Sequence, residues 1–321
     1  MRKTFFLLLI LFFYISEKET LANAITYPDF RSSMLRLDVP STDLTKEAHR
    51  EAVYNSSNSK YVTLFNDLYT QNIKQLESEP LEEGYRIPRI IHQIWLGGEV
   101  PKEFLPWMET WASLQRWEYK LWTDEDVKKL SLENKDLYEM ATNLGEKADI
   151  LRLEILALYG GLYVDVDFEC INPSIFEELH KSFHFYIGFE PLEHGKVARF
   201  NMFKVCNALI ASCPRHPLLK DLLLNMKANY FAYLPFRGVI EKTGPSYITR
   251  ILCEYAMASP GKYKNMYLPS TFFYPLTENE LLSLSLQPRE LPLPKEVAGI
   301  HYWSGSWFKT EKENLKKGYF R

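Results

Sequence analysis

Three features are scarce or missing in this chain: cysteine, extended basic runs and long apolar stretches. Only four of its 321 residues are cysteines, and none shows the C-x-x-C spacing typical of a zinc site. Lysine and arginine (38) are slightly outnumbered by aspartate and glutamate (41), which gives a net charge of −3. Without a basic run, nucleic acid is not expected as a main partner. No internal repeat or low-complexity segment is present, so we expect one large folded domain with decorations.

The apolar run at residues 5–15 is shorter than an ordinary membrane span of about 20 residues. It follows the basic pair Arg2-Lys3 and precedes an A-x-A cleavage pattern at residues 22–24. Residues 1–24 are therefore predicted to be the signal peptide of an exported protein, with an uncleaved signal anchor as the alternative. Export would permit disulfides among the four cysteines in three possible full pairings, whereas buried free thiols are an equally open alternative.

The rest of the chain is rich enough in apolar (46%) and aromatic (15%) residues to bury a sizeable core. Residues 25–84 are expected to form a helical accessory region, because apolar residues from Tyr61 to Leu76 keep helical spacing over several turns. A break at residues 80–84 precedes the expected core domain, residues 85–308. Residues 309–321 mix lysine with glutamate and are expected to form a solvated tail.

Strands and helices are predicted to alternate within this core domain. Strands are expected at residues 90–96, 117–122, 162–168 and 183–189, and a long buried helix at 146–159. Such alternation is typical of a largely parallel, Rossmann-like α/β sheet. Ligands bind these sheets at the carboxyl ends of the strands. His92 lies inside the first strand, is more typical of a packed core histidine than of a ligand, and is given no site role.

The stretch from residue 145 to 170 carries the clearest chemical signal. Its helix is expected to be buried on most sides and to end at Gly160 and Gly161. The following strand contains Asp165 and Asp167, which in an extended chain point to the same side. Two buried carboxylates repel each other, and a bound Mg²⁺ or Mn²⁺ would neutralise both. The alternative for a bare D-x-D is an exposed loop with two solvated aspartates.

The run ADILRLEILALYGGLYVDVD at residues 148–167 resembles the DXD region of the sugar-binding glycosyltransferases of family 32. That family includes yeast initiating mannosyltransferases and is similar to the catalytic core of the clostridial glucosylating toxins. Further matching segments follow in the family's order from Arg86 to Trp307. The resemblance implies an α/β GT-A fold, that is, a Rossmann-like, mostly parallel sheet flanked by helices. It also implies a nucleotide-sugar donor, a divalent cation (Mn²⁺ or Mg²⁺) and retention at the anomeric carbon.

The same resemblance implies roles for individual residues. Asp165, Asp167 and Asn207 would be catalytic, and the metal would be held by Asp165, Asp167 and His301. The implied substrate-binding residues are Trp95, Leu96, Gly97, Asp149, Arg152, Thr243, Gly244, Ser306 and Trp307, with Trp95 against the donor base. The residues by themselves leave alternatives open: Trp95 and His301 as core residues, Asn207 as a turn or cap residue, and Asp149 with Arg152 as an internal i,i+3 ion pair.

These features together predict a retaining, metal-dependent glycosyltransferase that moves a hexose from a UDP- or GDP-linked sugar to a glycan, lipid or protein acceptor. Two other classes stay open. A catalytically silent carbohydrate-binding or effector protein would keep the fold, and a glycoside hydrolase would use two separated carboxylates without a nucleotide. An uncleaved N-terminal segment would place the protein in the Golgi lumen and would be its only membrane contact, whereas cleavage would leave it secreted or periplasmic.

Overall fold

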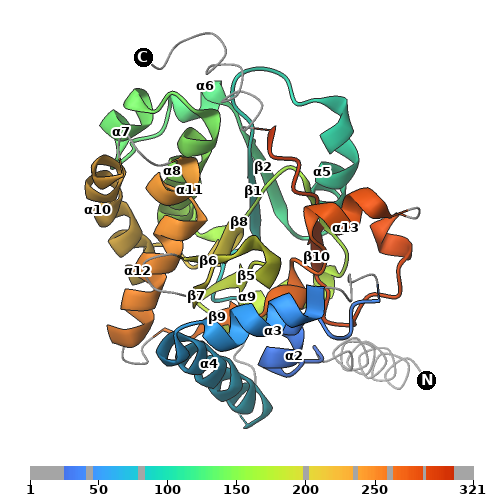
Figure 1. The fold of residues 1–321 in the computed structure, drawn as a ribbon. Coiled ribbons are helices and arrows are strands. Elements are labelled where there is room, and N and C mark those ends of the chain that lie inside the picture. The colour runs from blue at the N-terminus through green and yellow to red at the C-terminus, as the bar shows by residue number, and fades with distance from the viewer. Residues whose placement is uncertain are drawn as a thin grey trace, which may run out of the picture.

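The computed structural model describes residues 25–40, 46–78, 84–197, 202–233, 238–258, 263–284 and 287–306. These residues form a central six-stranded sheet with helices on both sides (Figure 1). The predicted signal segment at 1–24 and the predicted tail at 309–321 lie outside the described residues. None of the described helices is both long and apolar enough to cross a membrane.

The sheet has the strand order β2-β1-β3-β8-β5-β9. β1 is parallel to β2 and β3, and β5 is parallel to β9, whereas β8 runs antiparallel to β3 and β5. The carboxyl ends of β1, β2, β3 and β5 therefore meet at one edge, where β8 begins. The predicted α/β class, with its mostly parallel sheet flanked by helices, is confirmed. The strands are β1 (Ile90–Ile94), β2 (Glu118–Trp122), β3 (Gly161–Val164), β5 (Phe185–Phe189), β8 (Val205–Ser212) and β9 (Asn265–Leu268).

Two short ribbons accompany the sheet. β4 (Phe168–Cys170) pairs antiparallel with β10 (Gly299–His301), and β6 (Lys196–Val197) pairs antiparallel with β7 (Met202–Phe203). The first ribbon matters most for the site, because it brings the end of the described chain back beside the D-x-D segment.

Helices cover the sheet in two groups. Figure 1 shows α7, α8, α10, α11 and α12 on one side, and α5, α13 and β10 on the other. α8 contacts β1, β3 and β8, and α10 contacts both α8 and α12. The helices are α5 (Leu105–Ala112), α6 (Asp124–Val127), α7 (Lys135–Met140), α8 (Leu144–Tyr159), α9 (Pro173–Ser182), α10 (Pro217–Ala232), α11 (Val239–Lys242), α12 (Pro245–Ala258) and α13 (Glu278–Ser283).

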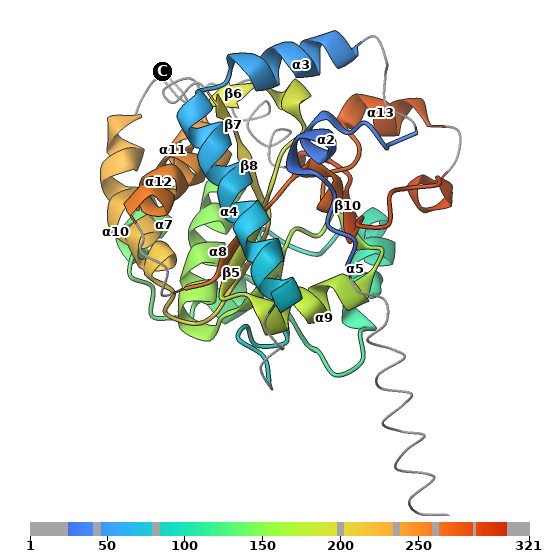
Figure 2. The same cartoon turned by 90° about the horizontal axis from the view of Figure 1, so that it is seen from below.

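The N-terminal segment contains α2 (Phe30–Leu35), α3 (Glu47–Ser56) and α4 (Ser59–Ser78). α4 packs against β9 at the edge of the sheet (Figure 1). Figure 2 shows α3 and α4 on the side of the molecule that faces the viewer. The Phe65 ring of α4 lies 5.2 Å from the Phe189 ring and 5.0 Å from the Tyr267 ring, measured between centroids. These helices thus share one apolar core with the sheet. The expected domain limits at residues 25, 85 and 308 stay predictions.

The predicted buried helix at 146–159 is confirmed as α8, in which every residue from Asp149 to Leu156 is buried. Two glycines end it, and both have positive φ angles, 66° for Gly160 and 101° for Gly161. A Cβ on Gly161 would lie 2.5 Å from the Ile90 carbonyl oxygen. Only glycine lets the chain turn there and enter the sheet beside β1.

The predicted continuous strand at 162–168 is wrong. β3 ends at Val164, and the chain turns at residues 166–167 before β4 begins at Phe168. Between the two aspartates, Val166 buries its side chain in a separate apolar cluster with Phe104 and Met108. The pattern of β-branched and aromatic residues is the same in one long strand and in two short ones, so periodicity alone does not detect the break.

His92 and three of the four cysteines are buried in the protein. His92 accepts a hydrogen bond at Nδ1 from the indole N–H of Trp122 (3.1 Å), and its Nε2 lies 2.8 Å from the Gly160 carbonyl oxygen. Burial lowers the pKa of His92 to about 4, so it is a neutral core histidine. All four cysteines are free thiols, and three of them are buried, which confirms the interpretation without disulfides.

Candidate functional site

The D-x-D segment is held at the carboxyl edge of the sheet by its neighbours. Asp165 directly follows β3, and its N–H donates to the Ala208 carbonyl oxygen on β8 (2.8 Å). The side-chain amide of Gln93 on β1 donates to the Asp165 carbonyl oxygen (3.2 Å). Asp165 is therefore fixed from both sides at the sheet edge where ligands bind in open α/β sheets.

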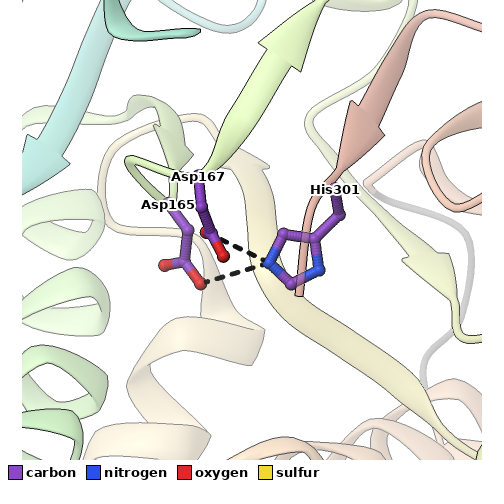
Figure 3. A group of neighbouring side chains, drawn as sticks. All are labelled: Asp165, Asp167 and His301. Atoms are coloured by element: carbon purple, nitrogen blue, oxygen red, sulfur yellow. Dashed lines mark ion pairs between the residues drawn. The ribbon is translucent and has the colours of Figure 1, made fainter. Parts of the chain in front are cut away.

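His301 reaches the same place from the far end of the chain. In the β4–β10 ribbon it stands opposite Phe168, next to Asp167 (Figure 3). Its Nε2 lies 3.2 Å from Asp167 Oδ1 and 3.9 Å from Asp165 Oδ2. One atom from each of the three residues lies within 4.8 Å of the others, and this group is suited to hold a metal ion. The structure thus brings the three predicted metal ligands together.

The other oxygen of each aspartate is occupied by protein donors. Ser304 donates to Asp167 Oδ2 through both its N–H (2.8 Å) and its hydroxyl (2.6 Å). Asp165 Oδ1 accepts from the Tyr163 hydroxyl and lies 3.4 Å from Arg152 Nη1. Each carboxylate therefore turns one oxygen toward His301 and anchors the second in the protein.

The protein shifts the pKa values of Asp167, Asp165 and His301 in different directions. Burial alone would raise the pKa of Asp167, but His301 and Ser304 lower it to about 2. Burial raises the pKa of Asp165, partly opposed by Arg152 and reinforced by the charge of Asp167. Burial disfavours a charged His301, yet Asp167 and Asp165 raise its pKa overall. The negative charge of the two aspartates is thus large enough to attract a cation, either a proton on the imidazole or a metal ion.

Aromatic rings hold the His301 imidazole in place. It stacks on Phe168 at 5.5 Å between centroids and meets Trp303 edge-on at 4.3 Å. Its Nδ1 is buried and has no hydrogen-bond partner among the described residues. Trp303 has a φ of 53°, which is uncommon for a non-glycine residue and marks local strain beside the site.

We call Asp165, Asp167 and His301 the metal group. Arg152 joins it to a second buried cluster. Its Nη2 lies 3.1 Å from Asp149 Oδ1, and its Nη1 donates to the Asn207 carbonyl oxygen (2.5 Å). The guanidinium also lies 4.4 Å from the centre of the Tyr163 ring. The internal ion pair between Asp149 and Arg152, open as an alternative from the sequence, is present, and Arg152 additionally reaches Asp165.

Asp149 gathers the remaining members of this cluster. Its Oδ1 accepts from the Asn207 side-chain amide (2.7 Å), and its Oδ2 accepts from the Thr243 hydroxyl (2.8 Å). Burial raises the pKa of Asp149 to about 6, although Arg152 and these hydrogen bonds oppose the rise. Asn207 lies within β8, so the turn or cap alternative for it is wrong. Four of the predicted site residues therefore form one network.

The remaining predicted residues that the structure describes make contacts of their own. Trp95 follows β1, is half-buried, and its indole N–H donates to the Glu99 carbonyl oxygen (3.0 Å). Leu96 is buried, and the N–H of Gly97 donates to Asp124 Oδ2 (2.9 Å). Gly244 lies between α11 and α12, and Ser306 is half-buried at the end of the described chain. Trp307 lies outside the described residues.

Sequence reasoning gave no site role to Ser304, Tyr163 or Trp303, although all three touch the metal group. Tyr163 stands two residues before Asp165, and Ser304 three residues after His301. The sequence signal that could have identified Ser304 is the H-x-x-S spacing from His301, which puts a hydroxyl near the histidine. Which aspartate oxygen that hydroxyl would reach depends on the pairing of β10 with β4 and is invisible in the sequence.

Comparison with known proteins places this geometry in context. Residues 101–184 match the family described as "Glycosyltransferase sugar-binding region containing DXD motif". Inositol phosphoceramide mannosyltransferase 1 of Schizosaccharomyces pombe is 28% identical over 188 residues, covering 54% of each chain. Inositol phosphoceramide mannosyltransferase 3 of the same yeast is 30% identical over 176 residues, covering 51% of this chain and 44% of that protein.

The chain thus spans about half the length of these curated relatives. Among solved structures, the catalytic domain of alpha-toxin from Clostridium novyi is similar with a TM-score of 0.38 and 13% identity, covering 71% of this chain and 76% of that one. The family match includes α8, the D-x-D segment and β4, the elements that build the first half of the site. Residues 101–184 are thus similar to the sugar-binding region of the DXD-containing glycosyltransferases.

Proposed function

We propose that this protein is a retaining, metal-dependent glycosyltransferase that moves a hexose from a UDP- or GDP-linked sugar to a glycan, lipid or protein acceptor. The observation that carries the proposal is the convergence of Asp165, Asp167 and His301 at the carboxyl edge of the sheet. The family match supports the reaction class.

The three side chains fit a divalent cation. Two carboxylate oxygens and one imidazole nitrogen suit Mn²⁺, and the carboxylates also suit Mg²⁺. Asp165 Oδ2, Asp167 Oδ1 and His301 Nε2 face one another, while Arg152, Tyr163 and Ser304 hold the opposite oxygens. When bound, the cation would neutralise the charge that grows on the departing diphosphate.

The chain's own residues would bind and orient the donor. We assign the nucleotide base to Trp95, whose half-buried ring stands at the end of β1. Asn207 is the best candidate for a sugar contact, because its amide is oriented by Asp149 at the same edge. Asp149 itself would act as a positioning residue, since both its oxygens already accept hydrogen bonds from Asn207 and Thr243.

The relatives suggest where to begin with substrates. Both yeast proteins are named as mannosyltransferases acting on inositol phosphoceramide, so GDP-mannose is the first donor to test, with UDP-linked hexoses in parallel. We further propose that residues 1–24 direct the protein into the export or secretory pathway.

The test is a screen of GDP- and UDP-sugars with the purified protein, with Mn²⁺ and with EDTA, measuring free sugar and nucleoside diphosphate. We expect release that requires Mn²⁺ and disappears in Asp167→Asn. The exposed Asp136 pairs with Lys227 on α10, so Asp136→Asn is the matched control and should keep wild-type rates.

Two results would overturn the proposal. No turnover of any nucleotide-sugar by folded wild-type protein would leave the catalytically silent class. Metal-independent cleavage of oligosaccharides without a nucleotide would instead identify a glycoside hydrolase.

A further inference from the structure

The imidazole of His301 is oriented by ring packing. A metal-binding histidine normally donates its second ring N–H to a carboxylate or a carbonyl oxygen, which fixes the direction of the ring. The Nδ1 of His301 has no such partner within the described residues. Its closest ring contact in that part of the chain is with Trp303, at 4.3 Å between centroids. The contacts that hold Trp303 therefore also influence where His301 points.

Two other segments hold Trp303. Its indole N–H donates to the Leu276 carbonyl oxygen (2.9 Å). Its ring also meets the imidazole of His194 edge-on, at 4.4 Å between centroids and an interplanar angle of 85°. The φ of Trp303 is 53°, a strained conformation that persists only where surrounding contacts enforce it. His194 is one of these contacts, and neither the metal nor the donor assignment gives it a role.

A buried carboxylate holds His194 in this position. Glu190 directly follows β5, at the same edge of the sheet as Asp165, and is only 5% exposed. Its Oε2 lies 3.3 Å from His194 Nδ1 and 3.4 Å from Lys204 Nζ. Burial raises the pKa of Glu190, but Lys204 and His194 lower it overall, so this carboxylate is ionised. Glu190 is thus a charged anchor for the His194 ring.

The N-terminal helices support the same turn. His194 ends η3 (Leu192–His194), a short 3₁₀ helix that contacts α3. The preceding residue, Glu193, pairs with Arg36 directly after α2, and its Oε1 lies 3.0 Å from Arg50 Nη1 on α3. Both arginines are buried. Two buried guanidinium groups on one carboxylate fix the turn that carries His194 to α2 and α3.

We propose that His194 is a positioning residue that acts through Trp303 on the His301 imidazole. Glu190 and Glu193 keep it in place, so the N-terminal helices α2 and α3 support the metal group from a distance. Holding the imidazole in one direction before the cation arrives removes part of the ordering cost of binding. This inference rests on the proposed function, because it concerns the cation of that reaction.

The first measurement is amide hydrogen exchange in metal-free protein. The N–H groups of Tyr302 and Ser304 donate to Asp167, so their exchange reports whether the segment around Trp303 is held. We expect His194→Ala to speed both exchanges at least about tenfold, while the Asp165 N–H, within the sheet, exchanges as in wild type. His194→Phe keeps a ring in place and should stay within about threefold of wild type.

The second measurement is Mn²⁺ binding by calorimetry, which needs no turnover. His194→Ala should weaken binding about tenfold, the lower end of the range for residues that orient a metal ligand. In a His301→Ala background the same substitution should change the affinity no further, because its effect passes through His301. Glu193→Gln should shift both measurements in the same direction by at least about twofold, because it removes a charge-assisted contact to α2 and α3.

His184 is the matched control. It is half-buried, stands before β5 at the opposite end of that strand, and meets Tyr263 edge-on at 5.3 Å between centroids. His184→Ala should leave both measurements as in wild type. A general folding defect in His194→Ala would speed the Asp165 exchange as well, and Glu193→Gln then decides the test.

Three results would count against the positioning role. Wild-type exchange and Mn²⁺ affinity in His194→Ala would overturn it. A loss of affinity that persists in the His301→Ala background would also overturn it, because the effect would then be a general structural one. Wild-type behaviour of Glu193→Gln would overturn the support assigned to the N-terminal helices.

The two measurements separate the positioning role from the proposed function. If wild-type protein binds no Mn²⁺ but His194→Ala speeds exchange at Tyr302 and Ser304, the positioning role stands and the metal-dependent function fails. If wild-type protein binds Mn²⁺ and turns over a nucleotide-sugar while His194→Ala matches it in both measurements, the positioning role fails and the proposed function stands.

Discussion

Replacing Thr243 with valine removes one of the hydrogen bonds that hold Asp149 inside the protein. The Thr243 hydroxyl donates to Asp149 Oδ2 at 2.8 Å, and both residues are buried. Valine has nearly the same shape, so the variant leaves no cavity and deletes only the donor. A hydrogen bond to a charged group stabilises a protein by about 1.5–3 kcal/mol, against about 0.5–1.5 kcal/mol for a neutral pair.

The loss should therefore depend on pH. Burial raises the pKa of Asp149 to about 6 in the folded protein, above the ordinary value of 3.8 that applies when unfolded. Ionised Asp149 thus destabilises the fold at high pH, and Thr243 offsets part of this effect. The offset is fully present above about pH 6 and shrinks as Asp149 becomes protonated below it.

Urea denaturation of wild type and Thr243→Val at about pH 7.5 and about pH 5 measures this difference. We expect the free energy of unfolding to fall by about 2 kcal/mol at the higher pH and by about 1 kcal/mol at the lower. Thr249 is the matched control, because its buried hydroxyl bonds only neutral backbone groups, the Pro245 carbonyl oxygen and the Val205 N–H. Thr249→Val should lose the same amount at both pH values.

Thr243→Ser keeps the hydroxyl and should remain close to wild type at both pH values. An equal loss in Thr243→Val at the two pH values would refute the reasoning, because it would mean that Asp149 does not change its charge in this range. A loss that grows toward low pH would refute it more strongly.

Three further predictions concern the backbone, the metal and the base. Gly161→Ala should lower the free energy of unfolding by at least about 3 kcal/mol in chemical denaturation, because a Cβ would lie 2.5 Å from the Ile90 carbonyl oxygen; a loss near 1 kcal/mol would contradict the close approach. His301→Ala should raise the Mn²⁺ concentration needed for half-maximal binding by at least about tenfold in calorimetry, whereas an unchanged value would make His301 a packing residue. Trp95→Ala should weaken nucleoside diphosphate binding by about 1–3 kcal/mol, and equal affinity would move the base elsewhere.

Local chemistry in the sequence was enough to predict α8 and its end. The helix follows from apolar residues repeated at helical spacing, and the Gly-Gly stop follows from the positive φ angles that only glycine adopts easily. The D-x-D aspartates and the resemblance to the glycosyltransferase sugar-binding region were also readable, because they depend on residue types at fixed spacing. The alternation of strands and helices was sufficient for the α/β class, although it did not reveal that β8 runs antiparallel.

Only the tertiary structure decided how these residues act together. The turn at residues 166–167 exists because Val166 buries its side chain with Phe104 and Met108, residues about 60 positions earlier in the chain. Ser304 selects which oxygen of Asp167 faces His301, through a contact across 137 positions. Arg152 links Asp149 to Asp165, and Glu169 fixes Arg289 beside Tyr302. Such contacts depend on strand pairing and packing between distant segments, which local periodicity and residue spacing do not encode.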